Sequence, residues 1–213
     1  MNHIVPGKQK LDLDHWLRRE HFNFFNAFEE PYYGVCVTID CTAAYRFVKQ
    51  QSISFHFYCL YQSLTAAQQI EAFRYRLEDG DVFIYDRIDG GGVVDRSDGT
   101  FGYGHFPYNS NLDEFLRTAA LESDRIRAAT GLPRTTANYL IRYSVLPWIN
   151  FTSLSHARAF SRQDSCPRIT FGKMTAHGET RSMPVSIHVN HAFVDGLQLG
   201  QYVERLQDAM NSR

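Results

Sequence analysis

Residues 185–206 read VSIHVNHAFVDGLQLGQYVERL and bring a strand pattern, a histidine and a helix pattern together in one short segment. Apolar side chains alternate with other residues from Val185 through Ile187 to Val189, which predicts a strand. The residues from Gly196 to Asn211 carry apolar side chains at the spacing of an amphipathic helix. His191 is therefore expected at the end of a strand, and Gly196 permits a sharp turn into the closing helix.

The histidine has a chemical use in this position. The ordinary pKa of histidine lies near 6.5, so the side chain of His191 accepts a proton at neutral pH and suits a general base. Asp195 either orients this ring or pairs with an arginine and holds the loop. The alternative is a core histidine beside a turn-forming Asp-Gly step.

Two other chemistries are weaker for the same segment. A metal site built from His188, His191 and Asp195 is disfavoured, because strand alternation puts the two histidines on opposite faces. A serine hydrolase is expected to carry its nucleophile in a G-x-S-x-G turn, and that pattern is absent from the sequence.

The rest of the chain mixes helices and strands without regular βαβ alternation. The sequence shows no internal repeat and no linker, which predicts one domain over residues 1–213. Helices are expected from Asp12 or Asp14 to about Phe28, and over 42–50, 55–69, 109–130 and 196–211. A hairpin is expected over 73–86, with its turn at Asp79-Gly80. The other expected strands lie over 34–40, within 89–105, over 181–190, and near 138–145, 149–154 and 168–175. The pattern predicts an α/β sandwich with a mixed sheet.

Composition excludes several classes of protein. The 22 Lys and Arg residues against 23 Asp and Glu give a net charge of −1, which argues against nucleic-acid binding. No apolar run approaches the length of about 18 residues that a membrane span requires. The N-terminal residues lack the apolar stretch of a secretory signal, so we expect a cytoplasmic protein. The four cysteines, whose spacing fits no zinc site, are expected to be free thiols.

Sequence elements along nearly the whole chain, from about residue 10 to 210, resemble the chloramphenicol acetyltransferases. His191 to Gly196 matches the His-x-x-x-Asp-Gly motif of the wider group of CoA-dependent acyltransferases. The further elements that resemble the family are Trp16–Phe22 (WLRREHF), the hairpin from Phe73-Arg74 to Asp86, Thr100-Phe101, Ser144–Ser153 (SVLPWINFTS), Thr170–Lys173 (TFGK) and Met183–Val185 (MPV).

The resemblance implies a reaction in which the acceptor hydroxyl attacks the thioester of acetyl-CoA directly. His191 is then the general base, its ring held by a backbone carbonyl. Ser144 stabilises the oxyanion, and Thr170 orients a water near the intermediate. Asp195 is implied to form a salt bridge with Arg18 and to act structurally.

The resemblance also implies a two-layer α/β sandwich with a mostly antiparallel mixed sheet. It implies a homotrimer whose active sites lie at the subunit interfaces. Candidate residues for the acceptor pocket are Phe24, Phe25, Phe101 and Tyr103, and Lys173 is a candidate for binding acetyl-CoA. No metal is expected.

The sequence departs from the family pattern in three places. Asn190 precedes His191 where the family usually has a second histidine. Met174-Thr175 replaces an aromatic pair near the expected CoA side, and residues 104–138 match least. We expect an acetyl-CoA-dependent O-acetyltransferase acting on chloramphenicol. The alternatives are a related enzyme for another hydroxyl or amine, and a non-catalytic protein that binds a drug.

Overall fold

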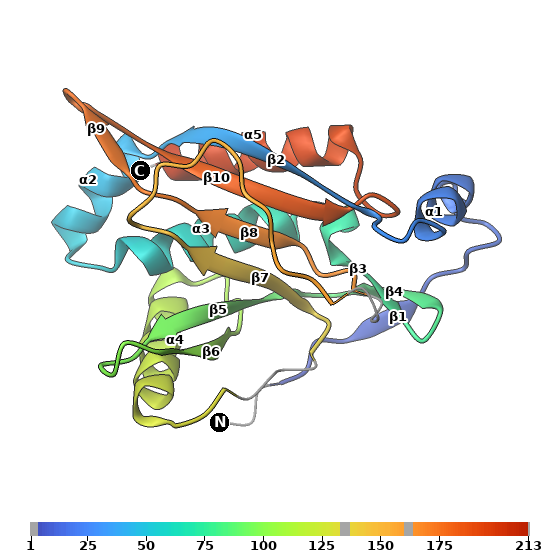
Figure 1. The fold of residues 1–213 in the computed structure, drawn as a ribbon, viewed down its shortest axis with the longest axis horizontal. Coiled ribbons are helices and arrows are strands. Elements are labelled where there is room, and N and C mark those ends of the chain that lie inside the picture. The colour runs from blue at the N-terminus through green and yellow to red at the C-terminus, as the bar shows by residue number, and fades with distance from the viewer. Residues whose placement is uncertain (1–3, 133–136, 160–163, 213) are drawn as a thin grey trace.

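The computed structural model describes residues 4–132, 137–159 and 164–212. Within them, one large mixed sheet is covered by helices on one face, and a small sheet lies at one end (Figure 1). The strands of the large sheet, in spatial order, are β2 (Tyr32–Asp40), β10 (Thr180–Asn190), β8 (Arg168–Phe171), β7 (Leu140–Val145), β5 (Asp89–Asp95) and β6 (Phe101–Phe106), with β9 (Thr175–His177) paired to β10.

The small sheet and the helices complete the described elements. The strands of the small sheet are β1 (Lys8–Lys10), β4 (Asp81–Tyr85) and β3 (Tyr75–Glu78). The α-helices are α1 (Arg19–Asn26), α2 (Thr42–Gln51), α3 (Phe55–Gln68), α4 (Leu112–Ala128) and α5 (Gly196–Asn211), and a short 3₁₀ helix spans Glu71–Arg74.

The large sheet is mostly antiparallel. Only β7 pairs in parallel with its neighbours β5 and β8, whereas the pairings among β2, β10, β8 and β9 and between β5 and β6 are antiparallel. This confirms the expected two-layer α/β sandwich with a mixed sheet.

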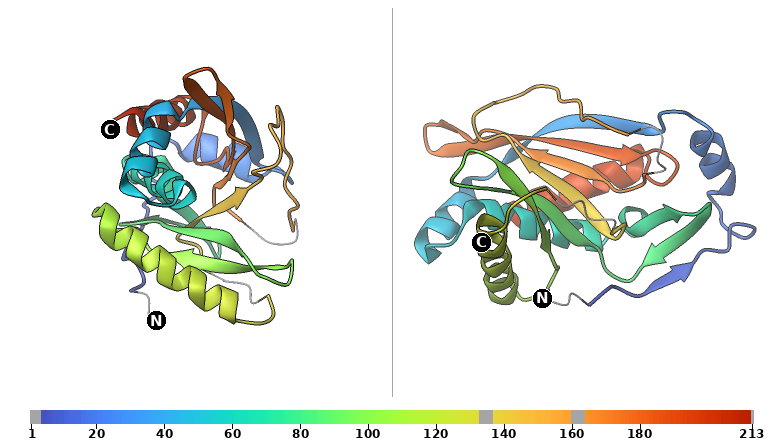
Figure 2. Two further views of the ribbon diagram at one scale, coloured as in Figure 1. Left: turned by 90° about the vertical axis from the view of Figure 1, so that its left-hand side faces the viewer. Right: turned by 60° about the horizontal axis from the view of Figure 1, so that its bottom comes forward.

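One face of the sheet is apolar and packs against α3 and α5. Ser63 of α3 joins the two layers there, because its hydroxyl lies 2.8 Å from the Tyr143 hydroxyl of β7 and 2.5 Å from that of Tyr202 on α5. The described parts of segment 146–167 cross the opposite face, as the edge-on view in Figure 2 shows. Because side chains alternate along a strand, residues next to Tyr143 point toward that second face.

The small sheet is tied to the large sheet by a buried arginine. The Arg76 side chain is fully buried and donates hydrogen bonds to the carbonyl oxygens of Phe73, Tyr75, Asn138 and Leu140. Leu140 is the first residue of β7, so the guanidinium holds the β3–β4 hairpin against the large sheet. Asp79 and Gly80 turn this hairpin with positive φ angles of 52° and 87°, as the Asp-Gly step predicts.

Three expected elements differ in the structure. α1 begins only at Arg19, because Asp12 accepts a hydrogen bond from the Asp14 N–H in a preceding turn instead of capping the helix. The strand expected over 149–154 is a loop. There the Ile149 N–H bonds back to Leu146 O and the Lys173 N–H bonds to Ile149 O, which leaves no strand ladder. The strand expected over 168–175 is divided into β8 and β9.

Neither membrane helices nor disulfides occur in the described part of the chain. No helix there is long and apolar enough to cross a membrane. All four cysteines are free, as predicted, with Cys41, Cys59 and Cys166 buried and Cys36 half-buried.

Candidate active site

His191 follows the last residue of β10 and is held by backbone and by aromatic rings. Its N–H bonds to the carbonyl oxygen of Pro31 at 2.8 Å, which fixes the chain beside the start of β2. Its imidazole stacks on Phe25 of α1, with ring centroids 3.8 Å apart and an interplanar angle of 10°. Tyr33 of β2 packs near the same imidazole at 4.5 Å. The end of β10, α1 and β2 therefore set the orientation of this ring.

The carbonyl contact expected at the imidazole is not present. His191 Nδ1 is buried and has no hydrogen-bond partner among the described residues. Packing between Phe25 and Tyr33 restrains the ring instead. Tyr33 was not among the candidate residues, although strand alternation on β2 places it on the same face as its partner Val189.

Asp195 pairs with Arg18 and does not orient the histidine. Its Oδ2 accepts a hydrogen bond of 2.7 Å from Arg18 Nη1, across 177 residues of sequence. Its Oδ1 accepts the Leu197 N–H at 3.0 Å, so Asp195 is also the N-cap of α5. Burial by itself would raise the pKa of the Asp195 carboxyl. The hydrogen bonds from Arg18 and from the Leu197 N–H outweigh this effect and lower the pKa.

A second group of candidate residues lies on the face of the sheet opposite α3. Ser144 of β7 pairs with Thr170 of β8, and Thr170 pairs with Ser186 of β10. Residues paired in register share a face. The three hydroxyl side chains therefore form a row across the sheet on the side crossed by segment 146–167.

The two groups lie apart within one chain. His191 is five residues beyond Ser186 along β10, which corresponds to roughly 16 Å at about 3.3 Å per residue. Figure 1 shows the same separation, because β10 ends beside α1 whereas β7 and β8 end at the opposite side of the sheet. A single chain thus brings Ser144 and Thr170 together but does not bring them to His191.

Two histidines that were not candidate residues of this group lie against the hydroxyl row. His156, in the β7–β8 loop, places Nε2 3.4 Å from Thr170 Oγ1. Its ring meets that of His188 edge-on, with centroids 4.9 Å apart. His188 Nδ1 lies 3.2 Å from Ser186 Oγ. No pattern in the sequence marks His156, since it comes from a loop.

Burial affects both of these imidazoles. Desolvation is the main cause that lowers the pKa of His156 to about 4, and electrostatic repulsion from His188 and Arg168 disfavours its protonation further. Desolvation and Arg168 also lower the pKa of His188. Both rings are therefore neutral at pH 7, and a neutral imidazole carries one N–H donor and one acceptor.

The four candidate pocket residues are divided between the two groups. Phe24 and Phe25 of α1 contact each other, and Phe24 is 62% exposed. Phe101 and Tyr103 are partly exposed on β6. Tyr103 pairs with Val93 of β5. Gly91 of β5 pairs in parallel with Arg142 of β7, so Val93, two residues further along β5, lies level with Ser144.

Lys173 lies close to the second group. It is exposed just after β8, and its backbone N–H bonds to Ile149 O at 2.8 Å. No ion pair is recorded for its side chain in the described structure, so its ammonium is available to an anionic group.

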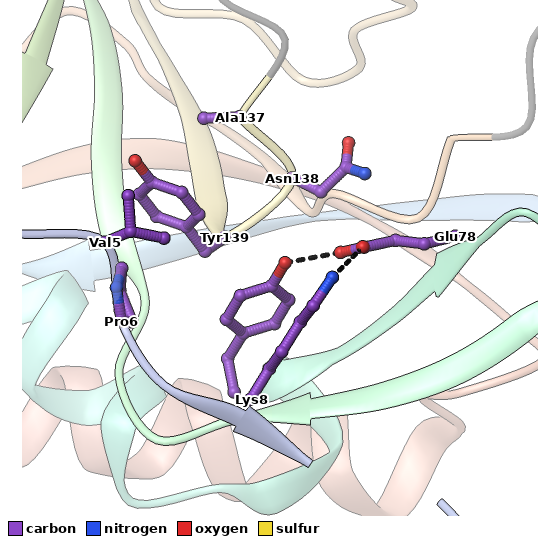
Figure 3. A pocket seen from close by; sticks show the side chains of 8 residues that line it. Val5, Pro6, Lys8, Glu78, Ala137, Asn138 and Tyr139 are labelled. Carbon is purple, nitrogen blue, oxygen red and sulfur yellow. Dashed lines mark hydrogen bonds and ion pairs between the residues drawn. The ribbon is translucent and has the colours of Figure 1, made fainter. Parts of the chain in front are cut away.

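A separate pocket of about 220 Å³ lies between β1, β4 and residues 137–139 (Figure 3). Glu78 binds the Lys8 ammonium there and accepts the Tyr85 hydroxyl, so these polar groups satisfy one another. None of the candidate site residues lines this pocket. Within the described residues no group of three His, Cys, Asp or Glu side chains is arranged to hold a metal ion.

Comparison with known proteins gives one consistent family. Residues 7–207 match the family model described as chloramphenicol acetyltransferase. The chain is 29% identical to chloramphenicol acetyltransferase 3 of Escherichia coli over 96% of its length and 97% of that protein. It is 27% identical to the chloramphenicol acetyltransferase of Proteus mirabilis, over 92% of each protein.

Solved structures give the same result for the fold. A chloramphenicol acetyltransferase superposes with a TM-score of 0.87 at 30% identity, covering 96% of this chain and 100% of that one. The catalytic core of a 2-oxoacid dehydrogenase complex from Thermoplasma acidophilum superposes with a TM-score of 0.63 at 14% identity, covering 95% and 97%. At 14% identity, this second similarity shows a shared fold only.

Proposed function

The chain belongs to the chloramphenicol acetyltransferase family, and from that premise we propose that it transfers the acetyl group of acetyl-CoA to a hydroxyl of chloramphenicol. The agreement covers both chains nearly end to end, and the motif histidine occupies a restrained position at the end of β10. The observation that carries the proposal is the stacked, half-buried imidazole of His191, one face of which packs on Phe25.

The chemistry needs one proton acceptor and one oxyanion donor. His191 Nε2 removes the proton from the acceptor hydroxyl, and the oxygen forms a bond to the thioester carbonyl carbon. Ser144 donates a hydrogen bond to the resulting oxyanion, and Thr170 orients a water beside it. The carbon–sulfur bond then breaks, and the sulfur leaves as the CoA thiol with the proton that His191 held.

We propose that a second copy of the chain completes each site. Ser144 and Thr170 lie roughly 16 Å from His191 along the sheet, too far to act on one carbonyl group. A contact between one end of a subunit and the opposite end of the next joins the two groups. Head-to-tail contacts of this kind close into rings, and the family resemblance implies a ring of three.

The substrates divide between the two groups in this arrangement. Phe24 and Phe25 beside His191, with Phe101 and Tyr103 from the neighbouring subunit, supply an aromatic surface for the acceptor. Lys173 offers a cation to the phosphates of acetyl-CoA. Acetyl-CoA is a cytoplasmic metabolite, so we place the reaction in the cytoplasm, where acetylation of the drug would confer resistance to the antibiotic.

The function is tested by release of the CoA thiol from acetyl-CoA, measured with a thiol reagent. We expect release to depend on chloramphenicol and to be lost in His191→Ala. Thiol release with another hydroxyl or amine compound, but not with chloramphenicol, would refute chloramphenicol as the acceptor and support acetyl transfer to a different one. Drug binding without any thiol release would favour a non-catalytic binding protein.

A further inference from the structure

We propose that His156 is a positioning residue that acts through Thr170, and this inference rests on the proposed acetyl transfer. The imidazole of His156 donates from Nε2 to the Thr170 oxygen and so leaves the Thr170 hydroxyl hydrogen free to point toward the reacting group. Nothing in the family motifs of the sequence includes His156, because it lies in the loop between β7 and β8.

The contact geometry singles out this histidine. His156 Nε2 lies 3.4 Å from Thr170 Oγ1, and this is the hydrogen bond recorded for the Thr170 side chain in the described structure. Thr170 is fully buried. A buried hydroxyl with one neighbouring imidazole takes its orientation from that imidazole.

His188 in turn supports the ring of His156. The two rings meet edge-on at 4.9 Å, and Ser186 Oγ fixes Nδ1 of His188 at 3.2 Å. Gly34 of β2 leaves room for this arrangement, since a Cβ at that position would lie 2.4 Å from the His188 ring. The chain is thus built so that two imidazoles stand side by side over the hydroxyl row.

The surroundings of His156 favour a neutral ring. Desolvation is the main cause of its low pKa, about 4, and His188 and the Arg168 guanidinium, which face the ring, add to this effect. A neutral imidazole with its hydrogen on Nε2 donates to Thr170 Oγ1. The Thr170 hydroxyl is then the donor to the water beside the intermediate, and a chain of aligned donors strengthens each bond.

Two substitutions separate hydrogen bonding from packing. His156→Gln keeps an N–H donor at a similar reach, and His156→Leu removes it. His177→Gln, at the exposed end of β9, is the matched control. Each variant is made in the wild-type chain and with Thr170→Val, and chloramphenicol-dependent thiol release gives kcat and KM.

We expect His156→Leu to lower kcat by roughly threefold to tenfold, the effect of one neutral hydrogen bond, with KM for chloramphenicol unchanged. His156→Gln should retain most of the activity, and His156→Leu should have no further effect once Thr170→Val is present. Three results would overturn the inference: unchanged kcat, an effect confined to KM, or an effect of equal size with Thr170→Val.

A measurement without turnover separates this inference from the proposed function. The ¹⁵N spectrum of the His156 ring should show hydrogen on Nε2 in the wild type and should change in Thr170→Val. Identical spectra would refute the contact. Lack of any drug-dependent release by the wild type would refute the acceptor instead.

Discussion

His191 is restrained by ring packing and by one backbone hydrogen bond, and no carboxylate contacts it among the described residues. Asp195, four residues later, is engaged by Arg18 and by the N-terminus of α5. Asp195 is therefore not available to orient the His191 ring, and packing on Phe25 and Tyr33 restrains the ring instead.

Ser144 is the residue on which we expect the oxyanion to depend. Ser144→Ala should lower kcat by about 10²-fold and leave KM for chloramphenicol nearly unchanged, because the donor acts on charge that develops only in the transition state. Steady-state thiol release measures both constants. Ser153→Ala, an exposed serine of the following loop, should be indistinguishable from the wild type. A Ser144→Ala enzyme as active as Ser153→Ala would contradict the assignment.

The buried imidazole of His156 gives stability a pH dependence. The native pKa of His156 is about 4, whereas its ordinary value is 6.5, so between these values the unfolded chain binds more protons than the folded chain. The free energy of unfolding should therefore fall as pH falls from 6.5 toward 4. Urea unfolding at several pH values measures this. The fall should be smaller in His156→Gln, and an equally steep fall would remove His156 as its source.

At the scale of elements, Asp195 joins α5 to α1. It caps α5 by accepting the Leu197 N–H and pairs with Arg18 at the start of α1. Asp195→Ala removes both roles and should lower the free energy of unfolding by roughly 1–3 kcal/mol. Asp195→Asn keeps an oxygen for the cap and should lose less. Chemical denaturation of both variants tests this, and equal losses would show that the cap contributes nothing.

Much of this element structure could be predicted from the sequence because its signals are local. The Asp79-Gly80 step predicts the hairpin, and alternation at Val185, Ile187 and Val189 predicts β10. Asn111 caps α4 two residues after the expected start of this helix. The strand expected over 149–154 is absent, because Ile149 bonds to Leu146 and Lys173 rather than to a strand. Local pattern carries no information about such tertiary partners.

The candidate site was predictable only where a motif carried it. The family motifs mark His191, Ser144, Thr170, Arg18 and Asp195, and the structure places the last two in contact. Phe25, a candidate for the acceptor pocket, stacks on His191. His156 and Tyr33 could not be predicted, because their roles come from a loop and a neighbouring strand that meet the site only in the fold.

At the scale of the whole molecule, the direction of the strands determines where the candidate catalytic residues lie. β10 runs opposite to β7 and β8, so His191 and the Ser144–Thr170 pair emerge at opposite ends of one sheet. The exposed aromatic side chains Phe24 and Trp148 lie on α1 and in the β7–β8 loop, one near each group. The proposed ring of identical subunits would use both ends of every chain and complete every site.

The central claim is that each active site combines His191 of one chain with Ser144 of another. His191→Ala and Ser144→Ala chains, each with a different tag, are coexpressed, and mixed oligomers are purified through both tags. In a ring of three, every mixed oligomer holds one intact site, so about one third of wild-type thiol release should return. If each site instead lay within a single chain, every chain of the mixed oligomer would carry one inactivating substitution. Mixed oligomers no more active than the two separate variants would therefore contradict the account.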